Sequence, residues 1–477
     1  MKQGLVMKKK QWGDWVTTQN EKSIGKTDWV ILGVLFSFAL FTILYIDIVT
    51  TYTHSLTLLD AVSEFDIVHF YDRTLAKPYD SVGAMYYITI YMIFAVWNLP
   101  VWILTKITSI SVYAPGCLIW CKLLVVVFAA GCAYMIYDIL IQMEYEHEKC
   151  IMAVFLFLSS LNFFVPVVAV SQYDIISLFF MLWGIRELLL YEKITWKFLV
   201  LFSFAISLKF FALFVFLPVV LLKEKRIFWI IKDYVAGLIV TVMCVIPFRN
   251  NAGYQELAGN FNNGITTRLF EHAIQGGNAS CPIFIGIFMA LCVLAYVKDG
   301  KEKRKLFQYS MWICYAVFLM FTIFVYVNPY WIVLLVPFQV LLWIQNNYEK
   351  KINMILDFGV NVAITGLYAY QYFWVYFSGD TFRFLTLKKL FENSSQKYHN
   401  LKELLDTGST YGLTPILFAA FVVCGISLLV INYPDRVNNI EKMEKSNISA
   451  IDHGMIYLRL LCILGYIVLT AVFAFGI

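Results

Sequence analysis

The chain is short of charged residues. Only 14% of its 477 residues are Asp, Glu, Lys or Arg, whereas 60% are hydrophobic and 18% are aromatic. Soluble globular proteins carry about a quarter charged residues, so this composition excludes an ordinary soluble protein and indicates a polytopic membrane protein. The net charge of +5 does not indicate nucleic-acid binding, because the basic residues gather in short loops between apolar segments, as the orientation of membrane proteins requires.

The chain also lacks the cysteine and histidine patterns of disulfide-rich and metal-binding proteins. Its ten cysteines are scattered, form no CxxC pair and fall mostly within apolar segments, where thiols behave as small hydrophobic side chains. The six histidines are far apart and show no metal-ligand spacing. The sequence therefore predicts neither a disulfide framework nor a structural metal.

No small-residue cleavage site follows the first apolar run, residues 29–49, so we predict a membrane anchor instead of a cleaved signal peptide. This run is long enough to cross about 30 Å of hydrocarbon. Further apolar segments follow at 83–105, 116–137, 150–171, 174–191, 198–222, 227–247, 282–297, 306–327, 330–345, 352–377, 412–432 and 455–477. Because backbone groups in lipid must be satisfied within their own segment, we predict an all-α, polytopic transmembrane helical bundle of about 11 to 13 membrane helices.

Basic loops set the predicted orientation. Lysine and arginine are concentrated in the N-terminal tail and in four loops that we expect on the cytoplasmic face: 223–226, 298–305, 350–351 and 436–445. Loops 248–281 and 378–411 and the acidic stretch after the first span then lie outside. Loop 378–411 carries five basic residues against this rule, and its segment 384–405 is predicted to be an amphipathic helix on the outer membrane surface.

Lys209 interrupts the apolar run 198–222 near its middle. A lysine near the bilayer midplane costs about 2.5 to 3.5 kcal/mol or more unless it reaches water or a partner, and snorkelling from this position would be a long reach. In one layout, two short helices meet at Lys209, segment 83–105 is re-entrant or surface-lying, and the turn 172–174 opens outward. In the other layout both segments span once, and the turn lies on the cytoplasmic face.

Acidic residues gather directly after the first span: Asp47, Asp60, Glu64, Asp66, Asp72 and Asp80. Such a cluster either faces water as an ordinary solvated loop or forms the rim of a reaction site. A carboxylate at a membrane surface can take a proton from an acceptor hydroxyl or hold a divalent metal beside a phosphate. Helix capping alone can explain Asp174, although Gln172 and Tyr173 before it favour a binding role.

Two further outer segments carry candidate binding residues. Loop 248–281 contains Arg268, His272 and several glycines, which could close over an anionic head group, although loops of this length are often plain connectors. Tyr330 belongs to the Asn-Pro-Tyr-Trp turn 328–331, whose aromatic pair also fits an interfacial belt position.

Taken in order along the chain, these residues resemble the C-type (GT-C) polytopic glycosyltransferases, which use polyprenyl-phosphate-linked sugars as donors, and especially their mannosyltransferase-like bacterial members. The resemblance covers residues 29–345. It rests on Asp47 just past the first span, the turn 172–174 opening a helix, Lys209 ending a short helix, Pro218 in the return helix, and the turn 328–331 before Val336-Pro337. The chain departs from the commoner pattern because no Asp-Asp or Asp-Glu doublet follows the first span.

The resemblance implies an inverting transfer in which Asp47 is the catalytic base, Asp174 assists acceptor or metal binding, and Lys209 holds the donor phosphate. Because several acids follow the first span, Asp60 and Asp66 also stay candidates for the base. The remaining candidates are Arg268 and His272 for donor phosphate, and Gln172, Tyr173 and Tyr330 for acceptor or donor contacts. Metal dependence is left open, with Mg²⁺ or Mn²⁺ as the candidate ions.

The sequence therefore predicts a multi-pass plasma-membrane glycosyltransferase with an outward-facing site. Its expected partners are the lipid bilayer, a polyprenyl-phosphate sugar donor, with a hexose expected, and an envelope glycan or lipid-linked acceptor, with no nucleic acid. We expect a cytoplasmic tail at 1–28, a GT-C-like catalytic module at 29–345, and a C-terminal transmembrane region at 346–477 with outer segment 378–411. The rival is a transporter or flippase, which usually shows two similar halves; an assembly scaffold is a third reading that would not need Lys209.

Overall fold

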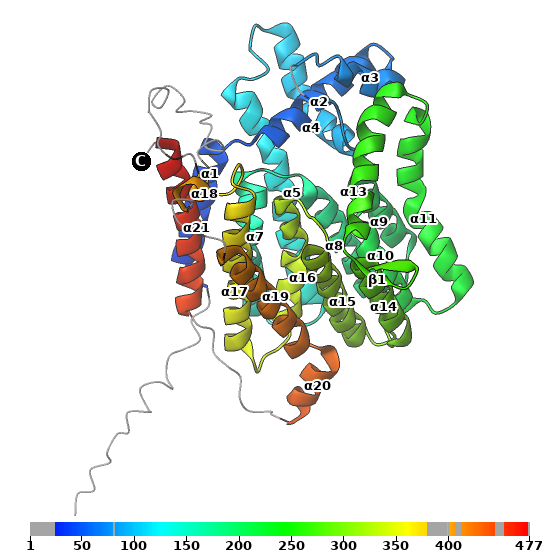
Figure 1. Cartoon of the computed structure of the whole chain (residues 1–477), viewed down its shortest axis with the longest axis vertical. Coiled ribbons are helices and arrows are strands. Elements are labelled where there is room, and N and C mark those ends of the chain that lie inside the picture. The colour runs from blue at the N-terminus through cyan, green and yellow to red at the C-terminus, as the bar shows by residue number, and fades with distance from the viewer. Residues whose placement is uncertain are drawn as a thin grey trace, which may run out of the picture.

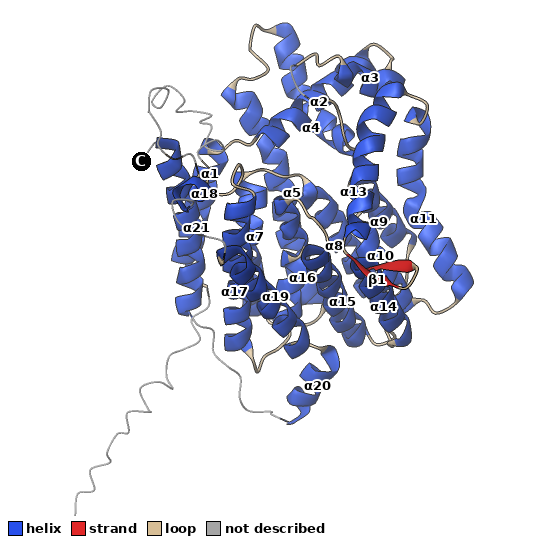
Figure 2. Ribbon diagram, in the orientation of Figure 1, coloured by secondary structure: helices blue, strands red, loops and turns tan. Residues whose placement is uncertain are grey.

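The described part of the chain is almost entirely helical. The computed structural model describes residues 24–79, 82–378, 398, 400–405, 412–443 and 453–475. Within these residues the strands form a single hairpin, β1 (Ala273–Gly276) and β2 (Ala279–Pro282), with Ala273 opposite Pro282, shown in red in Figure 2. Gly277 in its turn has φ +58°, a conformation that glycine adopts without strain. The predicted all-α class is confirmed for this part of the chain.

Seven described helices are long and apolar enough to cross a membrane, which makes the chain a membrane protein. They are α4 (Ile88–Ile107), α5 (Pro115–Gln142), α11 (Ile227–Val245), α15 (Lys303–Phe324), α17 (Lys350–Gln371), α19 (Leu413–Ile431) and α21 (His453–Phe475). An eighth span would be α6 (His147–Leu158) with residues 161–169, bent by 58°. That segment contains α7 (Leu161–Phe163) and the π-helical η3 (Phe164–Ala169).

The predicted 11 to 13 membrane helices are not confirmed among the described residues, where several apolar runs form helices too short to be candidate spans. These are α9 (Trp196–Leu208), α10 (Ala212–Lys223), α14 (Ile283–Val297), η6 (Pro329–Leu334) and α16 (Val336–Trp343). About 20 residues are needed to cross the hydrocarbon as a straight helix, so none of these crosses it alone.

The predicted first span, 29–49, is also divided. Three residues separate helix α1 (Lys26–Thr42) from helix α2 (Ile46–Ser63), and two of them, Ile43 and Tyr45, have extended backbone angles. The buried Lys122 of α5 donates hydrogen bonds to the carbonyls of Leu40 and Ile43, which would otherwise be unsatisfied at the end of α1. Asp47 therefore lies in the first turn of α2, which is not among the candidate spans.

The acidic stretch after the predicted first span and the first part of loop 248–281 lie together at one end of the molecule (Figure 1). Figure 1 draws α2, α3 (Phe70–Leu75) and α4 there, beside the upper ends of α11 and α13 (Asn260–Glu271). Asp72 of α3 accepts hydrogen bonds from the Asn251 side chain and, at 2.8 Å, from the Gly253 backbone. The short helices of this region are η2 (Ile67–His69), η4 (Ile246–Phe248), α12 (Ala252–Tyr254) and η5 (Gln255–Gly259).

Helix α4 packs against α2 at this end. The buried Asn98 side chain donates a hydrogen bond of 3.0 Å to Ser55 of α2, and the Trp102 indole donates one of 2.9 Å to Asp60. The sequence left two layouts for segment 83–105, and its helix α4 is long and apolar enough to be a candidate span; the re-entrant or surface-lying layout stays a prediction.

The chain turns back at Lys209. Helix α8 (Asp174–Tyr191) packs on α9, where the Ser177 hydroxyl donates to the Ala205 carbonyl at 2.9 Å. Lys209 has extended backbone angles between α9 and α10. Residues at the start of α9 and at the end of α10 line one common cavity. The predicted pair of short helices meeting at Lys209 is therefore confirmed.

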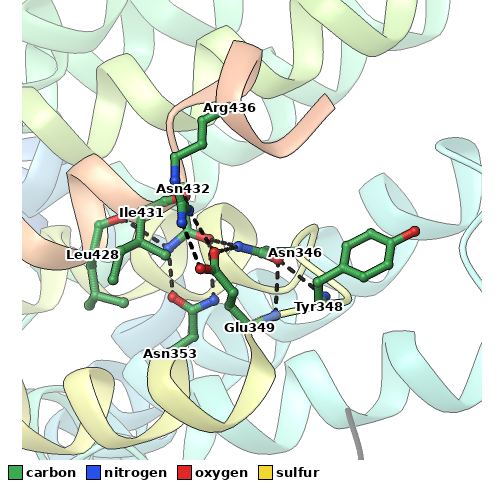
Figure 3. A network of polar contacts seen from close by, with 8 residues as sticks. All are labelled: Asn346, Tyr348, Glu349, Asn353, Leu428, Ile431, Asn432 and Arg436. Atoms are coloured by element: carbon green, nitrogen blue, oxygen red, sulfur yellow. Dashed lines mark hydrogen bonds and ion pairs between the residues drawn. The ribbon is translucent and has the colours of Figure 1, made fainter. Parts of the chain in front are cut away.

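A polar network ties the C-terminal helices together. Arg436 of α20 (Pro434–Met443) donates to both carboxylate oxygens of Glu349 at 2.6 and 2.7 Å, and Asn432 after α19 pairs with Asn353 of α17. Figure 3 shows Asn346 joining the same network. The turn before α17 is thereby fixed to the end of α19.

Some predicted segments lie outside the described residues. Of the predicted amphipathic segment 384–405, only 398 and 400–405 are described, and they include α18 (Leu401–Leu405). Asp80 and the tail 1–23 also lie outside the described residues.

Candidate functional site

A cavity of about 640 Å³ opens between α2, the chain before α4 and the turn at 328–330. Its wall includes Asp47, three threonines of α2 and Asn328. Six tyrosines also line it: Tyr79, Tyr86, Tyr91, Tyr113, Tyr173 and Tyr330. Tyrosine offers an aromatic face and a hydroxyl group at once, so this wall can hold a polyhydroxylated ring while a few polar groups fix its orientation.

Asp47 faces this cavity and is held by neutral donors. The Gln172 side-chain amide donates to one carboxylate oxygen at 2.7 Å, and the Tyr330 hydroxyl, on the same cavity wall, also favours the charged carboxylate. Burial raises the pKa of Asp47, and the hydrogen bonds from Gln172 and Tyr330 partly offset that rise. A carboxylate with a raised pKa is a stronger base, while its two donors fix its orientation.

Asp174 and Lys209 form a buried ion pair beside Asp47. Their side chains are 0% and 6% exposed, and the Lys209 ammonium lies 2.8 Å from the Asp174 carboxylate. The ammonium also lies 4.0 Å from the centre of the Tyr86 ring and 5.0 Å from that of Tyr173, a favourable position for a cation. No backbone N–H group of the described residues donates to the Asp174 carboxylate, so the ion pair with Lys209, and not helix capping, holds it.

The turn 172–174 connects these two sets of contacts. Gln172 reaches Asp47 while Asp174 reaches Lys209, and the Tyr173 ring packs edge-on against Tyr86 at 5.4 Å. The turn is set up by η3, after which the backbone N–H of Gln172 bonds to the carbonyl of Pro166 at 2.8 Å. The structure thus brings together six predicted site residues: Asp47, Gln172, Tyr173, Asp174, Lys209 and Tyr330.

Arg268 reaches the rim of the cavity from α13. Its guanidinium donates hydrogen bonds of 3.3 Å to the Asn328 side chain, which lines the cavity, and to the Tyr326 carbonyl. The His272 ring packs against Tyr326 with ring centres 4.9 Å apart. Among the described residues no carboxylate lies within ion-pair distance of Arg268, so its positive charge is available to an anion.

Asp60 and Asp66, the other two candidates for the base, each form an ion pair with a basic side chain. Asp60 accepts hydrogen bonds from Tyr79 at 2.8 Å and Trp102 at 2.9 Å, and Lys106 pairs with it at 2.9 Å. Asp66 lies outside the cavity lining and pairs with Arg73 at 2.7 Å.

The contacts of Asp66 also weaken it as a base. Hydrogen bonds from His69 and Arg73 lower its pKa, so its carboxylate holds a proton less readily than an ordinary aspartate. The geometry favours Asp47 over both alternatives.

His54 is a cavity residue that the sequence analysis did not single out. Its Nε2 lies 2.6 Å from the Val82 carbonyl, and its ring packs edge-on against Tyr91. Burial lowers the pKa of His54 to about 4, so the ring is neutral near pH 7 and fixes the chain at Val82. Residues 47, 51 and 54 share a helix face by spacing, and that pattern was the available signal.

The oxygen atoms around Asp47 offer few ligands for a divalent metal. The Gln172 side-chain oxygen accepts no hydrogen bond from a described group, and Asn328 lies on the same wall. Among the described residues no group of three or more His, Cys, Asp or Glu is placed to share an ion. Metal dependence, which the sequence left open with Mg²⁺ or Mn²⁺ as the candidate ions, is not tested by this arrangement.

Comparison with known proteins adds no relative. No protein-family model matches the chain, and no curated protein or solved structure matches it significantly. The chain is an all-α membrane protein with a tyrosine-lined cavity around Asp47, and its relation to the C-type glycosyltransferases rests on the residues named above.

Proposed function

We propose that the chain is an integral membrane glycosyltransferase that moves a sugar, expected to be a hexose, from a polyprenyl-phosphate donor to a hydroxyl group of an envelope glycan or lipid-linked acceptor at the outer membrane face. The observation that carries this proposal is the Asp47 carboxylate, which faces a cavity of about 640 Å³ and is bonded to neutral donors instead of a cation.

Asp47 would act as the base of an inverting transfer. Its carboxylate takes the proton of the acceptor hydroxyl, and the acceptor oxygen attacks the anomeric carbon from the side opposite the phosphate. The bond from that carbon to the phosphate oxygen breaks, and the polyprenyl phosphate leaves with the electron pair. Gln172 and Tyr330 hold the carboxylate in one orientation, which favours the transfer because the proton acceptor is already aligned.

The leaving phosphate needs positive charge. Arg268 is suited to this role because it borders the cavity through Asn328 and has no described carboxylate partner. The ammonium of Lys209 is already compensated by Asp174. We therefore assign Lys209 the positioning of the turn 172–174 through Asp174, and Arg268 the direct contact with phosphate.

The proposal is tested with the purified full chain in lipid nanodiscs and a panel of polyprenyl-phosphate hexoses, by measuring released polyprenyl phosphate and glycosylated acceptor. We expect Asp47→Asn to lower turnover by about 10² to 10⁴-fold, the usual contribution of a general base. Glu64→Gln is the matched control, because Glu64 is a 60% exposed carboxylate of the same acidic stretch that contacts Arg73.

Two results would contradict the proposed transferase activity. Unchanged turnover in Asp47→Asn would remove Asp47 as the base, and no release of polyprenyl phosphate from any donor would remove the transfer reaction. Asp47-dependent movement of an intact lipid-linked sugar across vesicle membranes, without release of polyprenyl phosphate, would instead establish the transporter or flippase alternative.

A further inference from the structure

A second cavity, of about 400 Å³, lies at the opposite end of α8 and α9 from Asp47. It is formed by the turn between α8 and α9 and by the turn between α10 and α11. Helix α8 starts at Asp174 in the candidate site and has 18 residues, which gives it a length of about 27 Å. The hydrocarbon core is about 30 Å thick, and this similar length supports placing the two cavities near opposite membrane surfaces.

The charges that line this second cavity leave a positive excess. Glu224 forms an ion pair with Arg226, whose guanidinium donates to both carboxylate oxygens of Glu224 at 2.8 and 2.9 Å. Lys193 and Lys232 are exposed, and among the described residues neither has a carboxylate within ion-pair distance. Asp233 is the remaining acid of the lining and is only 6% exposed.

Lys223 adds to the excess. Its ammonium donates to the Gly300 carbonyl at 3.1 Å, and no carboxylate in the described part of the chain lies within ion-pair distance of it. Three lysines thus oppose one buried aspartate after the Arg226 pair is set aside. The N-terminus of α9, capped by Thr195, lines the same cavity and contributes the positive end of its dipole.

The surroundings of the cavity are those of a lipid–water interface. Trp196 and Trp229 line it, and the Lys232 ammonium lies 4.3 Å from the centre of the Trp229 ring. Tryptophan is enriched at the head-group level of membranes. From this point α11 carries a row of exposed apolar side chains along its length: Ile227, Phe228, Ile231, Val235 and Ile239. Acyl chains can lie along that row.

We propose that this cavity binds the phosphate of an anionic phospholipid head group, with Lys193 and Lys232 as the direct phosphate partners and the acyl chains along α11. The ligand lies in the membrane leaflet opposite Asp47. It therefore differs from the polyprenyl-phosphate donor in place and in role, and this proposal does not depend on the glycosyltransferase proposal.

Native mass spectrometry of the purified full chain tests the site, with phosphatidylglycerol and phosphatidylcholine offered in equal amounts. We expect the wild type to retain phosphatidylglycerol preferentially, and K193A/K232A to lose about tenfold or more of that retention, because basic residues near a membrane surface attract anionic lipid strongly. The matched control is K197A/K301A, which removes two exposed lysines outside the cavity lining.

A second measurement separates the two sources of phosphate. A melting temperature that inorganic phosphate raises as much as phosphatidylglycerol does, through Lys193 and Lys232, would assign the site to free phosphate. A response to the lipid alone would assign it to the head group. Equal retention of phosphatidylglycerol by K193A/K232A and wild type, or an equal loss in K197A/K301A, would overturn the proposal.

Discussion

Asp47 takes its chemical character from the two neutral side chains that touch it. Burial raises the pKa of Asp47, and Gln172 and Tyr330 partly offset this rise. Among the acids that follow α1, this combination distinguishes Asp47 from Asp60 and Asp66, whose carboxylates contact cations at 2.9 and 2.7 Å. A carboxylate neutralised by a cation is a weak proton acceptor, whereas one held by amide and hydroxyl donors remains basic.

Replacing Gln172 should change the pH dependence of transfer. Gln172→Leu removes a hydrogen bond that favours the charged carboxylate, so the pKa of Asp47 rises further. Activity requires the unprotonated base and is lost as the pH falls through this pKa, so the acidic limb of kcat/KM should move to higher pH, by about one unit. Tyr330→Phe should move it in the same direction. If the acidic limb of the kcat/KM profile stays at the wild-type pH in both variants, another group is the base.

At the scale of secondary structure, the break between α1 and α2 decides where Asp47 lies. Lys122 donates to the carbonyls of Leu40 and Ile43 and thereby caps α1. The extended residues between the helices then place Asp47 in the first turn of α2. Lys122 is 0% exposed, and a buried lysine bonded to two carbonyls fixes their position closely.

Removing that cap should reduce catalysis without touching the cavity. Lys122→Met leaves the end of α1 without its donor, so we expect kcat/KM to fall by about tenfold or more, because small misplacements of a catalytic group are costly. Lys122→Arg can donate to the same carbonyls and should retain more activity than Lys122→Met. Equal activity of Lys122→Met and wild type would show that α2 holds its position without the cap.

The helix breaks differ in how well the sequence predicted them. The break at Lys209 was predictable, because a lysine inside an apolar run needs water or a partner, and the structure supplies Asp174. The break at residues 43–45 was not, because those residues are apolar and their stabilising donor is Lys122, 79 residues beyond Ile43. The partners of Asp60, such as Trp102 42 residues away, are likewise set by tertiary packing, which local patterns do not contain.

At the scale of the whole molecule, a buried ion pair joins the last helix to the bundle. Arg459 of α21 pairs with Asp357 of α17 and donates to the Ser159 hydroxyl at 3.1 Å, and both charged side chains are nearly inaccessible to solvent. Gln339 of α16 donates to the same aspartate at 2.7 Å. Three separate helices and the turn after α6 therefore meet at one charged cluster.

Breaking this pair should destabilise the protein strongly. Arg459→Met leaves the buried Asp357 without a countercharge, which costs about 3 to 5 kcal/mol, and we expect a clear drop of the melting temperature in detergent. The double variant Arg459→Met/Asp357→Leu removes both charges and should recover most of that loss. A single variant as stable as wild type would mean that the pair contributes nothing to the attachment of α21.

The turn at Lys209 also constrains how the protein is made. Helices α9 and α10 have 13 and 12 residues, each too short to cross the bilayer alone, so the insertion machinery must accept the two as one hairpin. The ammonium at its tip finds its carboxylate on α8, which leaves the ribosome first. Because of this chain order, the carboxylate of Asp174 is made before the ammonium of Lys209 that pairs with it.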